Sequence, residues 1–130
     1  MKTCIIDDEP DAIKALELIV RDFCPGLTIA GTAGYIEEAW ELIKSAQPDL
    51  VLLDIEMPRG DGFNLLDRFP MRKFDVIFVT AHTKRTEKAQ WYQAFSIMEK
   101  PVDIQLFQQT ISRLKAHRDA QPDRVYKIRP

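Results

Sequence analysis

Acidic residues stand directly after two short apolar runs of this chain, a placement that suits phosphoryl chemistry. Asp7 and Asp8 follow residues 4–6, and Asp54 follows residues 50–53. If both runs are parallel strands of one sheet, their carboxyl ends meet at one edge and the three carboxylates converge. Carboxylates at close quarters raise one another's pKa unless a cation lies between them. Mg²⁺ suits such an all-oxygen site, with phosphate oxygens as further ligands.

Two further residues at the ends of apolar runs could complete such a site. Lys100 follows the patch over residues 95–98 and would bring a positive charge to phosphoryl oxygens. Thr80 ends the run over residues 76–79, and its hydroxyl could donate a hydrogen bond to the same oxygens. Each has a simpler interpretation, because single lysines are usually solvated surface residues and threonine is common at strand ends.

The aspartates also have structural alternatives. A strand-ending aspartate such as Asp54 often accepts hydrogen bonds from turn amides, and one of Asp7 and Asp8 could cap a following helix. A helix cap is compatible with metal binding. Taken alone, Asp54 would favour the structural interpretation. Because all these residues follow the ends of predicted strands, their common position favours the chemical interpretation.

The alternation of apolar runs with helical periods predicts the fold that would position these residues. Strands are expected at residues 3–6, 27–30, 50–53, 76–79 and 95–98, and helices at about 10–23, 36–46, 63–69, 84–93 and 104–114. Three of the strands are almost wholly apolar, as expected when both faces are covered. Five strands and five helices in strict alternation predict a doubly wound α/β fold of three layers, with a five-stranded parallel sheet.

The composition of the chain limits the classes of protein to which it can belong. A chain of 130 residues with 45% hydrophobic content is expected to form one domain. Its net charge of −2 gives no reason to expect direct nucleic-acid binding, and its short apolar stretches predict no membrane span. Cys4 and Cys24, with no signal peptide before them, predict free thiols in a reducing, cytoplasmic compartment. Residues 119–130 lack a clear period and contain two prolines, which predicts a linker.

Four motifs in this order resemble the receiver domain of two-component response regulators. They are Asp7-Asp8-Glu9-Pro10, Leu53-Asp54-Ile55-Glu56-Met57-Pro58 with Gly60-Asp61-Gly62, Val79-Thr80-Ala81, and Lys100-Pro101. The resemblance covers about residues 2–117 and implies the flavodoxin-like fold of CheY. It divides the chain into a receiver domain over residues 1–118 and a tail over 119–130 that leads to an output domain outside this sequence.

The resemblance also implies a role for each site residue. Asp54 would accept a phosphoryl group from a phosphohistidine on a sensor histidine kinase or phosphotransfer protein. Asp8 and Asp54 would bind Mg²⁺ through their side chains, Glu56 through its backbone carbonyl, and Asp7 through water.

The remaining two motifs carry the switch. Thr80 would be the switch residue, and the small side chain of Ala81 would leave the phosphorus accessible. Lys100 would contact the phosphoryl oxygens, and its peptide bond to Pro101 is usually cis in the family.

Some positions depart from the family pattern or stay open. Ile97 stands where the family usually has Tyr or Phe, three positions before the lysine, so the coupled threonine–aromatic rotation does not carry over. Signalling could run through the loop after Thr80 or through nearby aromatic residues, or Ile97 could simply pack its strand. Glu56 and His82 could tune the hydrolysis of the aspartyl phosphate or be two exposed polar residues. Trp91 and Tyr92 predict either a partner surface or a core contribution.

The function expected from this resemblance is a phosphorylation-activated signalling switch in transcription regulation, and not an enzyme. The stretches 55–58 and 76–82 also resemble receivers that precede LytTR-type DNA-binding domains. A dimer could form through the face of helix 84–93, strand 95–98 and helix 104–114. Two alternatives are a haloacid-dehalogenase-type phosphatase, for which Glu56 is a poor second acid, and a receiver that acts as a protein-interaction module without phosphorylation.

Overall fold

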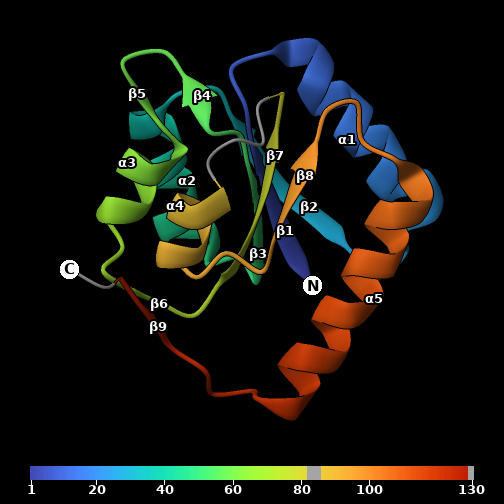
Figure 1. Cartoon of the computed structure of the whole chain (residues 1–130). Coiled ribbons are helices and arrows are strands. Elements are labelled where there is room, and N and C mark those ends of the chain that lie inside the picture. Colours follow the sequence, from blue (N-terminus) through green and yellow to red (C-terminus); the bar gives the residue numbers. More distant parts are fainter. Residues whose placement is uncertain (82–85, 129–130) are drawn as a thin grey trace.

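Five parallel strands form the central sheet of the computed structural model, which describes residues 1–81 and 86–128 (Figure 1). The strands are β1 (Lys2–Ile6), β2 (Thr28–Ala33), β3 (Leu50–Leu53), β7 (Asp75–Thr80) and β8 (Ser96–Glu99). Their order is β2-β1-β3-β7-β8, and every neighbouring pair is parallel. The predicted doubly wound α/β fold and its five strands are therefore confirmed, with shifted strand ends.

The strands form where the sequence is apolar because the middle of the sheet is covered on both sides. All four residues of β3 and all six of β7 are buried, so these strands carry continuous apolar runs. The edge strand β2 instead alternates exposed and partly buried residues, and this weaker pattern hides its true end. It continues to Ala33, beyond the predicted end at residue 30.

In the described part of the chain, five helices cover the two faces of the sheet. They are α1 (Pro10–Phe23), α2 (Ile36–Ala46), α3 (Gly62–Asp67), α4 (Thr86–Trp91) and α5 (Ile104–Ala120). One apolar cluster joins the sheet to α1 and α5, and the other joins it to α2, α3 and α4. Figure 1 shows these two layers on opposite sides of the strands. The helix predicted over residues 84–93 is shorter than expected: α4 ends at Trp91, and residues 84 and 85 lie outside the described residues.

Two small antiparallel pairs add to the predicted elements. β4 (Glu56–Met57) pairs with β5 (Gly60–Asp61) in the loop after β3, and β6 (Met71–Arg72) pairs with β9 (Tyr126–Lys127). The second pair lies within residues 119–130, where the sequence showed no clear period and predicted a linker. α5 runs past residue 118 to Ala120, residues 121–125 are exposed, and residues 126–128 lie against the fold. The division into a receiver domain and a tail that leads to a further domain stays a prediction.

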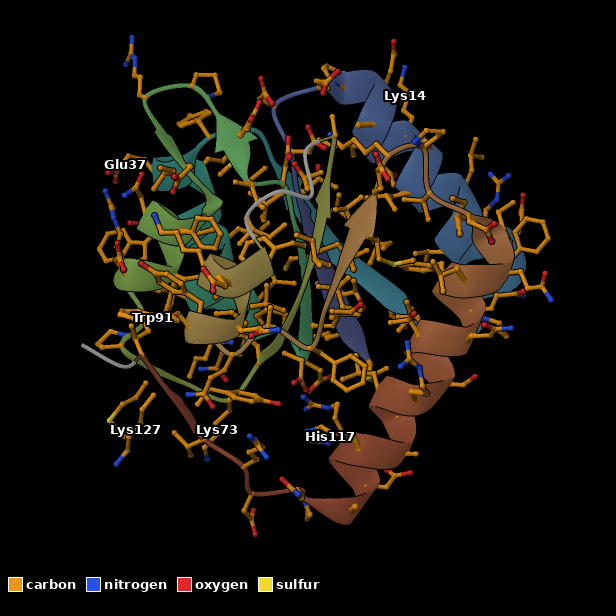
Figure 2. The ribbon with its side chains drawn as sticks, viewed as in Figure 1. Lys14, Glu37, Lys73, Trp91, His117 and Lys127 are labelled. Atoms are coloured by element: carbon orange, nitrogen blue, oxygen red, sulfur yellow. The ribbon has the colours of Figure 1, made fainter. Side chains whose placement is uncertain are left out.

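The two adjacent aromatic residues at the end of α4 have opposite environments. Trp91 is 60% exposed and lies on the outer surface of the molecule in Figure 2, whereas Tyr92 is 9% exposed. The Tyr92 ring packs against Phe63 with 5.1 Å between centroids, and its hydroxyl donates to Asp67 at 2.6 Å. One aromatic therefore belongs to the core and the other to the surface. Of the helices described, none is long and apolar enough to cross a membrane.

Candidate functional site

The carboxyl ends of β1 and β3 bring the predicted aspartates together. Ile6 and Leu53 are paired in register, so Asp7 and Asp54 leave the sheet side by side. The Asp54 amide donates to the Ile6 carbonyl at 2.9 Å, which holds the two strand ends at this spacing. Oxygens of Asp7, Asp8, Glu9 and Asp54 all lie within 4.8 Å of one another. The predicted convergence of carboxylates at one edge of the sheet is therefore observed.

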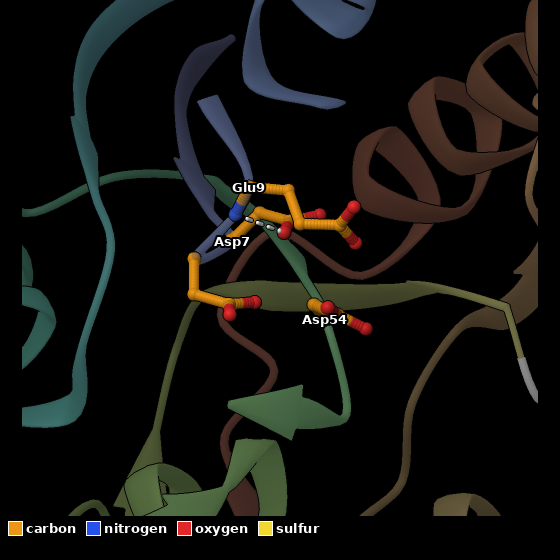
Figure 3. A group of neighbouring side chains, drawn as sticks. Asp7, Glu9 and Asp54 are labelled. Carbon is orange, nitrogen blue, oxygen red and sulfur yellow. Dashed lines mark hydrogen bonds between the residues drawn. The ribbon is translucent and has the colours of Figure 1, made fainter. Parts of the chain in front are cut away.

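The cluster combines two buried and two exposed carboxylates. Asp7 is 2% exposed and Asp54 is 4% exposed, whereas Asp8 and Glu9 lie at the surface. Figure 3 shows Asp7, Glu9 and Asp54 around one space, with the Glu9 amide donating to Oδ1 of Asp7 at 2.9 Å. Glu9 was not predicted as a site residue. Its side chain arrives through the turn between β1 and α1, which the periodicity of the sequence does not describe.

Lys100 reaches this cluster from the end of β8. Its Nζ lies 2.6 Å from Oδ2 of Asp7, 3.3 Å from Oδ2 of Asp54 and 3.4 Å from Oε1 of Glu9. Burial opposes the charge of the ammonium, but the hydrogen bond to Asp7 and the charges of Asp54 and Asp7 outweigh it and raise the Lys100 pKa. The peptide bond from Lys100 to Pro101 is cis, as the resemblance implied.

The Asp54 carboxylate is held in an environment that disfavours its charge. Burial, followed by the charge of Asp7, raises its pKa, and the Lys100 ammonium only partly offsets both. Oδ1 accepts a weak hydrogen bond from the Glu56 amide at 3.4 Å, and Oδ2 lies beside Lys100. A buried carboxylate short of compensating charge gains from any cation or charge-neutralising ligand that reaches it.

A pocket of about 320 Å³ opens over Asp54. Thr80 lines it from the end of β7, where it is fully buried, and Ala81 lines it from the exposed start of the next loop. Glu56 lines another side from β4 and is exposed. The structure thus gathers all the predicted site residues but Asp7 around one pocket, and Asp7 lies beneath it against Lys100. The prediction for His82 falls outside the described residues.

Gly62 fixes the loop that carries Asp54, a role that the sequence motif alone did not assign. A Cβ at this position would lie 2.5 Å from the Asp54 carbonyl oxygen, so only glycine permits the observed approach. The Gly62 amide donates to the Ile55 carbonyl at 2.7 Å. Directly before it, Asp61 caps α3 through a reciprocal pair of bonds with Asn64.

Ile97 occupies the position where the family has an aromatic switch residue. It is partly buried on β8, paired in register with Phe78, and packs against the apolar cluster beneath α2, α3 and α4. The position therefore contributes packing here. Tyr92 contributes an aromatic ring to the same cluster from the end of α4.

The donor set fits a hard divalent cation. In the part of the chain that the structure describes, four carboxylates face the Lys100 ammonium, so these groups together carry an excess of negative charge. Among the described residues, all the candidate side-chain ligands are oxygens, which suits Mg²⁺ better than a metal that prefers thiol or imidazole ligands. Asp8 and Glu9 are accessible from solvent, so a hydrated ion could reach the buried oxygens from that side.

Comparison with known proteins agrees with this geometry. The family model for the response regulator receiver domain matches residues 3–112. The probable C4-dicarboxylate response regulator DctR of Bacillus subtilis is 32% identical over 124 residues, covering 90% of this chain and 53% of that protein. The sensory transduction protein LytR of Staphylococcus haemolyticus is 32% identical over 117 residues, covering 88% of this chain and 45% of that protein. The chain thus spans about half the length of these relatives.

A solved structure shows the same fold. The response regulatory domain of mrkE from Klebsiella pneumoniae superposes with a TM-score of 0.83 at 23% identity, covering 93% of this chain and all of that one. Sheet order, strand-end carboxylates and the family match lead to one conclusion. This chain belongs to the response regulator receiver domain family of two-component systems.

Proposed function

We propose that Asp54 accepts a phosphoryl group from a phosphohistidine of a sensor histidine kinase or phosphotransfer protein, and that the product changes what this domain contacts. The observation that carries the proposal is the Asp54 carboxylate itself. It is buried at the base of an open pocket, 3.3 Å from an ammonium and within an acidic cluster. Such a carboxylate can act as a nucleophile towards a phosphoryl group when a cation that binds beside it neutralises the negative charge.

The chemistry needs an in-line displacement at phosphorus. An oxygen of Asp54 forms the new O–P bond, the P–N bond to the donor histidine breaks, and the electron pair leaves with the imidazole. Lys100, beside Asp54, supplies a positive charge to the transferred phosphoryl oxygens. Mg²⁺ held by Asp8, Asp54 and the Glu56 carbonyl, with Asp7 acting through water, would neutralise the charge of the carboxylates and the phosphoryl group.

The switch would start at Thr80. Thr80 lines the same pocket as Asp54, and its hydroxyl would donate a hydrogen bond to a phosphoryl oxygen once a phosphoryl group is attached. With Ile97 in the aromatic position, the response would run through the backbone after Thr80 or through the nearby aromatic residues Trp91, Tyr92 and Phe95. Glu56 and His82 would set the lifetime of the aspartyl phosphate. The local change in charge thereby biases a larger structural equilibrium.

The two alternatives have less support. The family assignment argues against a haloacid-dehalogenase-type phosphatase, because receiver domains are typically phosphoacceptor switches. The complete set of Asp7, Asp8, Asp54 and Lys100 in one cluster of charged side chains argues against a receiver that works without phosphorylation.

The output belongs to transcription regulation in this proposal. Relatives of about twice the length include the sensory transduction protein LytR and the transcriptional regulatory protein BtsR of Escherichia coli, and this chain aligns with roughly half of each. We propose that the receiver controls a LytTR-type DNA-binding domain of a longer cytoplasmic regulator. Dimerisation through the face of α4, β8 and α5 would be one route of control. This segment itself would not contact DNA.

Intact mass spectrometry after incubation with phosphoramidate tests the proposal. The wild type should gain one phosphoryl group only when Mg²⁺ is present, and Asp54→Asn should gain none. Asp8→Asn should lose most of the reaction, and the little that remains should not depend on Mg²⁺. Asp123→Asn changes an exposed residue of the tail and should behave as wild type. Equal phosphorylation of Asp54→Asn and wild type would refute the assignment of the acceptor.

A further inference from the structure

The segment that follows α5 runs past the amino ends of the central strands, whereas the acidic residues lie at the carboxyl ends (Figure 1). Its strand β9 pairs with β6, with Arg72 opposite Tyr126, and the Ile128 amide donates to the Pro70 carbonyl at 3.1 Å. Residues 121–125 are exposed, so few contacts hold the segment. A groove of about 760 Å³ borders it. We call residues 121–128 the strap.

Tyr126 is the anchor of the strap. Its side chain is 4% exposed, and its hydroxyl donates to the carboxylate of Asp75, which also accepts from Arg118 at 2.7 Å. Burial, and then the hydrogen bond to Asp75, raise the Tyr126 pKa to about 12, so the phenol stays a donor at neutral pH. One aromatic side chain therefore ties the strap to the start of β7 and to α5.

Arg72 joins this anchor to the end of α4. It is 3% exposed, and its guanidinium lies 4.8 Å from the centre of the Tyr126 ring. Nη2 donates to the carbonyls of Tyr92 at 2.7 Å and Gln93 at 3.2 Å, directly after α4. A second link runs from the Gln93 side-chain amide to the Lys127 carbonyl. Strap and α4 thus share one buried cation and one direct hydrogen bond.

The same stretch of chain continues to the phosphoacceptor site. The turn after α4 leads into β8, with the Phe95 amide bonded to the Val76 carbonyl at 2.8 Å. β8 ends at Glu99, and Lys100 follows at once with its contacts to Asp7 and Asp54. One short segment therefore carries the strap's partners at its start and the site lysine at its end. A shift of this segment as one unit would change both sets of contacts.

We propose that docking of the strap and the position of the α4–β8 segment form one coupled equilibrium, which passes the state of the site to the chain that follows. In one state, Lys100 contacts the carboxylates of Asp7 and Asp54. In this state the end of α4 is placed so that Arg72 and Gln93 can bind the strap. A phosphoryl group on Asp54 draws Lys100 and β8 to a new position and weakens the strap. This second step rests on the proposed function. The coupling is reciprocal, so loss of the strap also loosens the α4 end.

Hydrogen exchange of backbone amides tests the coupling without any phosphorylation. Tyr126→Phe removes the bond to Asp75, and Gln93→Asn shortens the side chain that reaches Lys127 while keeping a residue that tolerates its positive φ of 58°. Gln93→Asn should speed exchange of the Ile128 amide by roughly fivefold, the effect expected for one hydrogen bond. Tyr126→Phe should likewise speed exchange at the amides of Ala94 and Phe95.

Matched controls separate coupling from general loosening. Gln47→Asn makes the same change at the end of α2, where φ is 48°, and Val125→Ala alters an exposed side chain next to the anchor. Neither should affect the α4 end. Faster exchange confined to the strap in Tyr126→Phe, with unchanged α4 and β8 amides, would overturn the proposal.

Beryllofluoride with Mg²⁺, which mimics the aspartyl phosphate, tests the link to the site. Changed exchange in the loops around Asp54 and Lys100 reports that the mimic has bound. If the mimic binds and the strap amides exchange faster, the full proposal is supported. If the mimic binds and exchange of the strap amides is unchanged, the second step is overturned. No change at Asp54 or Lys100 counts against the proposed function instead, while the variants still decide the coupling.

Discussion

Replacing Lys100 by methionine should destabilise the metal-free protein, because the variant leaves two buried carboxylates without their cation. Methionine keeps an unbranched apolar side chain and removes the charge. The ammonium lies 2.6 Å from Asp7 and 3.3 Å from Asp54, whose side chains are 2% and 5% exposed. Without it, both carboxylates would have to keep their charges at close range in a poorly solvated place, or bind protons.

The magnitude follows from these distances. With an effective dielectric constant of about 20, the two attractions amount to roughly 6 and 5 kcal/mol. The cost of burying the charges offsets much of this, and the lysine side chain is itself 17% exposed. Removing one partner of a buried ion pair costs about 3–5 kcal/mol, so we expect a loss near the lower end, about 3 kcal/mol.

Urea denaturation at pH 7 with EDTA, and again with saturating Mg²⁺, measures the effect. We expect Mg²⁺ to bind the native carboxylates and add stability, and to do so more strongly where no ammonium competes for them. The deficit of Lys100→Met should therefore shrink to below about 1 kcal/mol. Lys14→Met, a change at an exposed position of α1 labelled in Figure 2, is the control. A deficit equal to that of the control, or one that Mg²⁺ leaves unchanged, would refute the reasoning.

Three further changes test other parts of the site. Asp54→Asn should stabilise the metal-free protein by about 1 kcal/mol at pH 7. Because burial and Asp7 raise the pKa of Asp54 in the folded state, this gain should fade as pH drops through that pKa, which urea titrations at several pH values would show. Gly62→Ala puts a Cβ 2.5 Å from the Asp54 carbonyl, so it should cost about 1–3 kcal/mol in thermal unfolding and slow phosphorylation in the same mass assay. Tyr92→Phe removes the 2.6 Å bond to Asp67 and should cost about 1 kcal/mol without changing phosphorylation.

The sheet and most of the site were predictable because they depend on local patterns. Fully buried strands such as β3 need continuous apolar runs, and parallel strands gather their carboxyl ends at one edge. Asp7, Asp54 and Lys100 could therefore be placed together from their positions after such runs. Glu9 could not be placed in the same way, since the turn after β1 decides where its side chain points.

The strap was missed for a different physical reason. A segment held by a single buried side chain has no periodicity, and Tyr126 stands between two exposed residues, Val125 and Lys127. Its partner Arg72 is a charged residue that is almost fully buried, the reverse of the usual preference for arginine. Likewise, the sequence could not tell which of Trp91 and Tyr92 faces the core, because α4 is too short to show a stripe.

The most direct test of the central claim is to locate the phosphoryl group chemically. Borohydride reduces an aspartyl phosphate to homoserine, so peptide mapping after phosphorylation with Mg²⁺ and reduction identifies the modified residue. The account predicts homoserine at position 54 alone, in a reaction that EDTA abolishes. Homoserine at Asp7 or Asp8, or a phosphoryl group on a serine, threonine or histidine, would contradict it.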